Sequence, residues 1–119
     1  MSTQDALRPA YPPVRKVTTS VTPVAVFERA VRTGNACTVR FLIQGIRRST
    51  GVANFFERVI RVHNPAGTPI VVSNNAPIPD DAPTGYSINV DATSPGFRVS
   101  VVGGGHSVDW SSQLAEIAE

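Results

Sequence analysis

Apolar and polar residues alternate along much of the chain after residue 35. The clearest case lies between Cys37 and Gly45, where every second side chain is apolar: Cys37, Val39, Phe41 and Ile43. Successive side chains of a strand point to opposite faces, so this period of two predicts a half-buried strand. The same period recurs in Tyr86–Asp91, Phe97–Val101 and Val108–Ser111, which predicts three further strands.

The run Asn54–His63 is rich in aromatic and β-branched residues but alternates imperfectly. Phe56 and Ile60 fall on one face of the expected strand, whereas Phe55 and Val59 fall on the other. Apolar residues on both faces are typical of a strand that is covered on both sides. We therefore expect a buried strand here, followed by a shorter strand over residues 68–73.

Turn-forming residues separate these strands at short intervals. Turn-forming residues (Gly, Pro, Asn, Asp, Ser and Thr) occur at residues 47–51, 64–67, 74–85, 92–96 and 103–105. Short alternating strands between such turns predict an all-β fold, namely an antiparallel β-sandwich of jelly-roll or Ig-like type with about six to eight short strands. The predicted core consists of Val39, Phe41, Ile43, Phe56, Ile60, Val62, Ile88, Val90, Phe97, Val99, Val101 and Trp110.

The first 22 residues differ from the rest of the chain. Prolines at positions 9, 12 and 13 exclude a regular helix there, and few large apolar side chains are present. We divide the chain into an extended N-terminal arm, residues 1–22, and a β-sandwich domain, residues 23–119; residues 23–32 fit either a strand or a short helix. The arm is either a disordered tail or a segment that orders on a partner. In the second case the docking residues are Tyr11, Pro12, Pro13, Val14 and Arg15.

Length and composition narrow the class of protein. With 119 residues the chain is expected to hold one domain. No apolar run reaches the roughly 18 residues of a membrane span, and the N-terminus shows no signal-peptide pattern. A single cysteine, Cys37, excludes an intrachain disulfide.

The net charge of +2 conceals a strong asymmetry. Residues 1–61 carry ten basic and three acidic side chains, whereas residues 62–119 carry one basic and six acidic ones. A basic half is typical of nucleic-acid binding, but it also suits docking on an acidic surface or on a second copy. We predict the second role, because arginine is favoured at protein interfaces. The interface candidates are Arg40, Arg47, Arg48, Arg58 and Arg61.

Catalytic and metal-binding patterns are weak in this sequence. His63 and His106 adjoin turns, and Cys37 falls on an apolar stripe, so no nucleophile–base pair is indicated. Asp80 and Asp81 lie in a proline-rich loop without the spacing of a calcium-binding loop. We therefore predict no enzyme activity, no cofactor and no metal.

Two binding functions stay open as alternatives. Arginines next to Phe55 and Phe56 could form the basic, aromatic face of a single-stranded nucleic-acid-binding protein. Tyr86 or Trp110 could stack on a sugar, as in a carbohydrate-binding module for host attachment. The chain lacks the motifs of known RNA-binding folds, which makes the nucleic-acid hypothesis the weaker one.

The region from Cys37 to Trp110 resembles a small β-sandwich module of tailed-bacteriophage virion proteins, of the tail-fibre, baseplate-associated or head-decoration type. The resemblance rests on the strand that begins with Phe55-Phe-Glu-Arg, the Asn64-Pro-Ala-Gly67 turn, the Asp80-Asp81 loop, the strands Tyr86–Ala92 and Gly96–Gly103, and the closing Val108-Asp-Trp110. The triple glycine, His106 and the proline-containing arm depart from that pattern.

This resemblance implies a non-enzymatic virion structural protein whose Trp110 is structural. We expect it to dock through its arm on the particle surface, as a head decoration (cement) protein or a tail-fibre or baseplate component. The expected partners are major capsid, tail or baseplate proteins and further copies of the chain, with a trimer as the leading form. Membrane and nucleic acid are not expected partners. The expected localisation is the virion surface, after synthesis in the host cytoplasm without a signal peptide.

Overall fold

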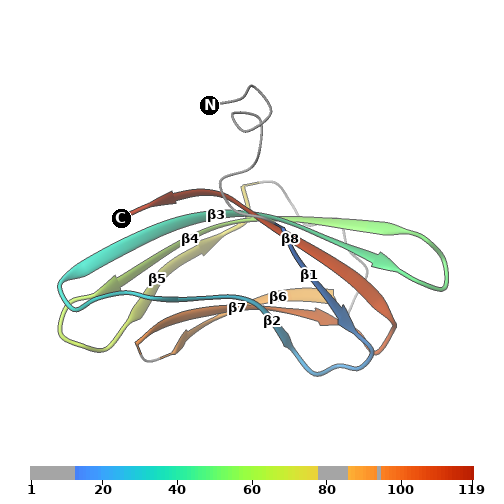
Figure 1. Cartoon of the computed structure of the whole chain (residues 1–119), viewed down its shortest axis with the longest axis horizontal. Helices are drawn as coiled ribbons and strands as arrows, with labels where there is room; N and C mark the ends of the chain where they lie inside the picture. The colour runs from blue at the N-terminus through green and yellow to red at the C-terminus, as the bar shows by residue number, and fades with distance from the viewer. Residues whose placement is uncertain (1–12, 78–85, 94) are drawn as a thin grey trace, which may run out of the picture.

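The computed structural model describes residues 13–77, 86–93 and 95–119, which form eight strands packed as a two-layered β-sandwich (Figure 1). No helix occurs in these ranges, and so none of them supplies a helix that could cross a membrane. The strands are β1 (Val14–Thr18), β2 (Val24–Ala30), β3 (Asn35–Arg47), β4 (Ala53–Asn64), β5 (Ile70–Asn75), β6 (Tyr86–Thr93), β7 (Gly96–Gly103) and β8 (Val108–Ala118).

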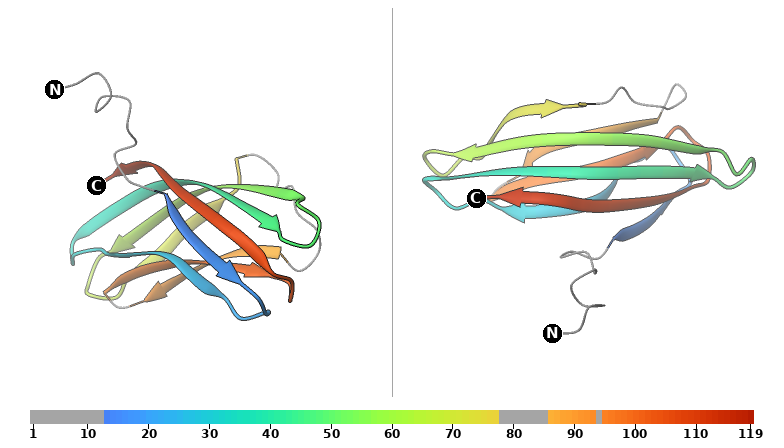
Figure 2. Two further views of the ribbon diagram at one scale, coloured as in Figure 1. Left: turned by 45° about the vertical axis from the view of Figure 1, so that its right-hand side comes forward. Right: turned by 90° about the horizontal axis from the view of Figure 1, so that it is seen from above.

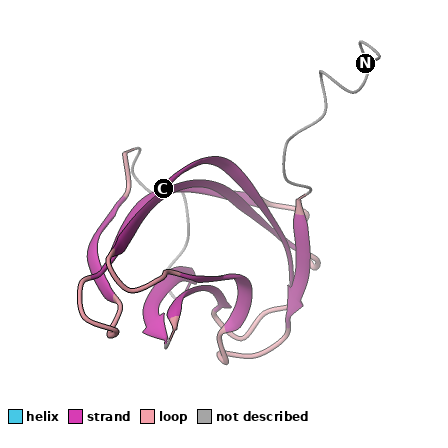
Figure 3. Cartoon of the chain, turned by 60° about the vertical axis from the view of Figure 1, so that its left-hand side comes forward, coloured by secondary structure: helices cyan, strands magenta, loops and turns pink. Residues whose placement is uncertain are grey.

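The strands form one large and one small sheet, both antiparallel. The five-stranded sheet has the order β1-β8-β3-β4-β5, and the three-stranded sheet has the order β2-β7-β6. Seen from above, β8, β3 and β4 run side by side along the length of the large sheet (Figure 2). The large sheet arches over the small one, with β1 and β5 on its flanks (Figure 3). The predicted all-β antiparallel sandwich is therefore confirmed.

The N-terminal boundary of the domain differs from the one expected from the sequence. Residues 14–18, assigned to the arm, form β1 and pair with β8 from Val14↔Ser112 to Thr18↔Val108. The three prolines that suggested an arm all precede β1, so none of them removes a donor from this ladder. Residues 24–30, for which helix and strand were both open, form the edge strand β2.

The core lies between the two sheets. The inward side chains of β3 and β4 pack against those of β6 and β7, as the period of two requires. The residues predicted for the core are buried there, except Val90, which is partly buried and packs against the cluster. Phe27 of the small sheet contacts both layers. Its ring centroid lies 4.8 Å from that of Phe41, in an edge-on arrangement, and 5.7 Å from that of Phe97.

The expectation that β4 is covered on both faces is wrong. Phe56 and Ile60 are buried, but Phe55 on the opposite face is 52% exposed and Val59 is only partly buried. The chain builds two layers, and the small sheet covers only the inner face of the large one. The outward apolar residues of β4 therefore stay at the surface.

A buried hydrogen bond attaches β1 to the core. The indole N–H of Trp110, a residue only 1% exposed, donates to Oγ1 of Thr18 at 2.8 Å. Two glycines permit this packing: a Cβ at Gly45 would lie 2.9 Å from the Trp110 ring, and one at Gly103 would meet the Thr18 hydroxyl. An unpaired buried N–H is costly, so the bond matters for stability.

We predict that Thr18→Val destabilises the domain by about 1–3 kcal/mol, because it leaves the Trp110 N–H buried without an acceptor. Urea unfolding measures this loss. Thr19→Val is the matched control, since it changes the same side chain at the next, exposed position. Equal stabilities of the two variants would contradict the structural role of the bond. The loss should also shrink when Thr18→Val is made in a Trp110→Phe background, which has no N–H to satisfy.

Candidate functional site

Six of the eight exposed large apolar side chains of the described residues belong to strands of the five-stranded sheet; the other two, Val21 and Val52, lie in loops. We call one surface of this sheet the outer face: the side of the five-stranded sheet that points away from the three-stranded sheet. It carries Val17 of β1, Leu42 and Ile46 of β3, Phe55 of β4, and Ile70 and Val72 of β5. Exposed apolar patches often mark binding sites, so the outer face, on which Phe55 adjoins Leu42 and Ile46, is the candidate binding surface.

The strand register brings three of these side chains together. Phe55 lies opposite Gln44 in the β3–β4 ladder, so it is the diagonal neighbour of both Leu42 and Ile46. Diagonal pairs on a sheet are about 7–8 Å apart and within reach of an aromatic ring. Polar side chains of β8 border this cluster, because Ser111 pairs with Gln44 and Gln113 with Leu42. We refer to Leu42, Ile46 and Phe55 as the apolar cluster.

The predicted interface arginines do not form one basic surface. Arg40 projects from β3 on the outer face, where its guanidinium donates to Glu57 at 2.8 Å and to Glu116 at 3.3 Å. These two carboxylates raise the pKa of Arg40, with the hydrogen bond to Glu57 as the largest cause. Arg61 is also on this face and exposed.

Arg48 makes a forked contact with Asp109. Its Nε and Nη2 donate to the two carboxylate oxygens at 2.8–3.1 Å, the bidentate geometry that suits arginine. The hydrogen bond to Arg48 holds the pKa of Asp109 below its usual value of 3.8, and desolvation opposes this shift only in part. The fork connects the β3–β4 turn to β8.

Arg58 and Arg47 lie elsewhere. Arg58 is on the inner face of β4, 8% exposed, where it donates to the carbonyl of Glu57 and lies over the Phe56 ring at 6.0 Å. Arg47 ends β3 and is half-buried, and its carbonyl accepts from Gly51 in the turn. The prediction of a common interface is wrong for Arg58, because this residue lies two positions from both Phe56 and Ile60 and strand alternation places it on their inner face.

Part of the charge asymmetry of the chain is compensated by ion pairs within the domain. β8 carries acidic residues from the second half of the sequence and lies directly beside β3, which carries basic residues from the first half. The pairs Arg48–Asp109 and Arg40–Glu116 therefore join the two halves, and Arg98 pairs with Glu28 across the small sheet. The asymmetry thus gives no support to a uniformly basic docking face.

The predicted arm residues are only partly described. Tyr11 and Pro12 lie outside the described residues. Pro13 is exposed, Val14 is half-buried against the core, and Arg15 is exposed opposite Ser111. Val14 and Arg15 therefore belong to the domain itself, because both lie in β1, and the side chain of Val14 packs against the core.

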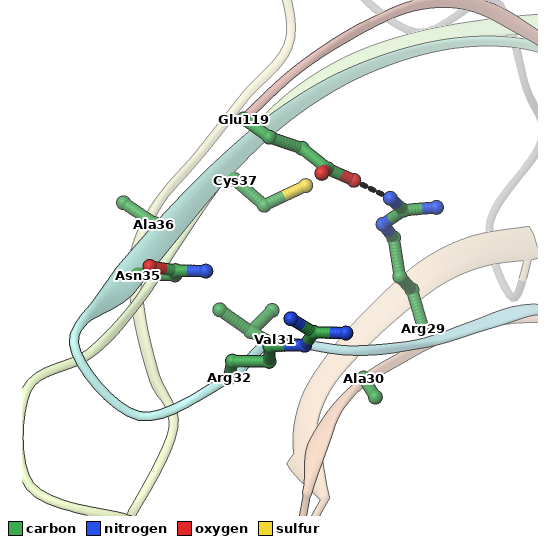
Figure 4. A pocket seen from close by; sticks show the side chains of 8 residues that line it. All are labelled: Arg29, Ala30, Val31, Arg32, Asn35, Ala36, Cys37 and Glu119. Carbon is green, nitrogen blue, oxygen red and sulfur yellow. Dashed lines mark ion pairs between the residues drawn. The ribbon is translucent and has the colours of Figure 1, made fainter.

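A pocket of about 320 Å³ opens between the end of β2 and the start of β3 (Figure 4). Arg29 forms an ion pair with Glu119 there, and the side chains of both point toward Cys37. Burial raises the pKa of the Cys37 thiol, although the neighbouring Arg29 lowers it in part. A buried thiol with a raised pKa is mostly protonated at neutral pH, so it is a poor nucleophile.

The remaining candidates for chemistry do not converge. His63 and His106 are exposed; His63 lies in β4 and His106 in the turn between β7 and β8. The ring centroids of His106 and Tyr86 are 6.3 Å apart. Asp80 and Asp81 fall outside the described residues, within which no group of three potential metal ligands occurs. Tyr86 and Trp110, the proposed sugar platforms, are both buried and pack against each other.

No family model matches the chain, and no curated protein matches it in sequence. Among solved structures, it is similar to the crystal structure of the Acinetobacter phage vB_ApiP_P1 tailspike protein, with a TM-score of 0.47 and 12% sequence identity. The match covers 88% of this chain and 22% of that one, so the chain spans about a fifth of the tailspike chain.

We predict that Asp109→Asn weakens the domain in a pH-dependent manner. The pKa of Asp109 is lower in the folded protein than its usual value, so its ionised form stabilises the fold above about pH 4 and this contribution is lost as the pH falls further. The wild type should therefore exceed the variant in stability at pH 7, and the two should converge as the pH is lowered from 7 through the depressed pKa of Asp109. Urea unfolding across this range measures the difference.

The control is the same substitution in an Arg48→Met background, where the partner of Asp109 is absent. There the pH-dependent difference should disappear. A stability gap that stays constant from neutral to acid pH would show that the Arg48–Asp109 pair does not cause it.

Proposed function

We propose that the chain is a non-enzymatic structural protein of a tailed-phage particle. It docks on the particle surface through the segment before β1, as a head decoration protein or as a tail-fibre or baseplate component. The sequence features that resemble phage virion modules fall on β4, β6, β7 and β8 and on the turn after β4. These elements build the sandwich itself, so the resemblance concerns a scaffold rather than a reactive site.

The observation that carries this proposal is the anchoring of β1. This edge strand is held by its ladder with β8 and by the buried bond between Thr18 and Trp110. The chain before it starts at exposed Pro13, at one edge of the five-stranded sheet. Because this segment is joined directly to a fixed strand, a partner that binds the segment also holds the whole domain close to its own surface.

The two alternative functions have less support. Carbohydrate binding was based on Tyr86 and Trp110, whose rings are buried. Nucleic-acid binding was based on outward arginines, but Arg58 lies on the inner face and Arg40 is paired with carboxylates. An assembly role uses neither the rings nor a uniformly basic face.

Self-association is a second part of the proposal. Burial of additional surface stabilises a small domain, and particle proteins commonly assemble with closed symmetry. We propose a homo-oligomer, with a trimer as the leading form. Sedimentation equilibrium at micromolar concentration gives the mass directly, and the mass of one chain, 12.7 kDa, would contradict this part.

We predict that deletion of residues 1–12 abolishes binding to the particle while the sandwich stays folded, because β1 and Thr18 are retained. The measurement is the amount of protein that co-sediments with purified particles of the phage that encodes it. Deletion of residues 1–20 is unsuitable, since it also removes β1 and unfolding would confuse the result.

The matched control replaces residues 1–12 with a Gly/Ser segment of equal length, which keeps the length but removes the side chains. Its binding should be lost as well. Retained occupancy of the deletion variant would overturn docking through this segment, and the absence of the full chain from the particle would overturn the virion role.

A further inference from the structure

We propose that the outer face of the five-stranded sheet is a second contact surface for the same particle protein that the N-terminal segment engages. The partner surface is an uncharged, largely apolar hollow, and the apolar cluster of Leu42, Ile46 and Phe55 lies at the centre of the contact. This inference rests on the proposed function and adds the surface by which the body of the domain is seated.

The two outer surfaces of the sandwich differ in composition. The exposed large apolar residues of the described strands belong to β1, β3, β4 and β5, and none of them belongs to β2, β6 or β7. The small sheet instead presents the Arg98–Glu28 pair and short polar side chains such as Ser87 and Asn89. Burial of apolar area drives most protein association, so the large sheet is the side that gains from contact.

The charges on the outer face are nearly balanced. Arg48, from the adjoining turn, forks onto Asp109, and Arg40 lies between Glu57 and Glu116. The outward-facing positions of these strands carry three arginines and three carboxylates, namely Arg15, Arg40, Arg61, Glu57, Asp109 and Glu116. A polyanion needs a basic surface, whereas a balanced face suits an uncharged protein partner.

The shape of the sheet specifies the shape of the partner. The five strands arch over the small sheet (Figure 3), so the outer face is convex, and β8, β3 and β4, the middle strands of the sheet, lie along its crest (Figure 1). A convex partner surface would contact this convex face over a small area only, whereas a concave partner surface can contact all five strands. The five strands hold 47 residues. At a rise of about 3.4 Å per residue and a strand spacing of about 4.8 Å they span about 770 Å², close to the roughly 800 Å² per partner of a standard interface.

The N-terminal segment starts at the edge of this same face. Arg15 and Val17 of β1 point outward, opposite Ser111 and Asp109 of β8. A partner held by the segment therefore lies beside the outer face at high effective concentration. Two linked contacts of modest strength can then give firm attachment.

The test introduces a charge into the apolar cluster. Phe55→Glu and Leu42→Glu place a carboxylate at the centre of the contact, on side chains that are already exposed. Val21→Glu and Val52→Glu are matched controls, because both valines are exposed but lie in loops outside the strands of the face. Phe55→Ser and Leu42→Gln repeat the test without a charge, and circular dichroism and thermal unfolding verify that each variant is folded.

We expect the cluster variants to lose particle occupancy at least tenfold in co-sedimentation, whereas the controls stay within twofold of the wild type. If the wild type binds the particle and folded cluster variants bind equally well, the outer face is not a contact and the proposed function stands. If the wild type does not bind, both proposals fail. If purified wild type self-associates and Phe55→Glu alone abolishes this, a second copy occupies the face, and the inference is overturned.

Discussion

The contact between Trp110 and Thr18 is the interaction on which the rest of the structure depends. Trp110 is the largest fully buried side chain, and its ring packs against Phe56 and Tyr86 from both sheets. Its one polar atom is satisfied by a residue of the edge strand. The burial of the indole therefore requires β1 to be in place, and the edge of the sheet is fixed together with the core.

Pairing of β8 with two strands decides how the charges are distributed. Because β8 lies between β1 and β3, its acidic residues meet arginines that are far away in sequence. Basic and acidic residues that lie in different halves of the sequence, and therefore suggest an acidic partner, form ion pairs with each other in the folded domain. These pairs are exposed and contribute little stability individually, but they leave the outer face almost without net charge.

Local alternation explains why much of the fold could be predicted. Val39, Phe41 and Ile43 share one side of β3 because a strand has a period of two, and this period needs no knowledge of the partner strand. The strand β1 could not be found in this way, since Arg15 and Lys16 interrupt its apolar pattern. Its formation depends on the ladder with β8, more than ninety residues later, which no local pattern encodes.

The candidate site was harder to predict for the same reason. Phe55 has the sequence signature of a buried residue, and only the number of layers shows that nothing within the sandwich covers it. The arginines were expected to act together, but the register assigns Arg58 to the core side and gives Arg40 two carboxylates. Side-chain direction can be deduced from a strand's period; the neighbours of a side chain depend on strand order.

Polar neighbours also explain how an exposed apolar cluster can be tolerated in the free protein. Gln44 and Ser111 lie in the row that contains Phe55, and Gln113 lies in the row that contains Leu42. Amide and hydroxyl groups stay hydrated when the face is free, yet they can form hydrogen bonds with a partner when it is covered. The apolar side chains are thus separated into a pattern that an unrelated apolar surface does not match. Under the proposed function, specific association requires a partner that complements both the arch of the sheet and the positions of these polar groups, because the docking segment before β1 starts at an edge of this face.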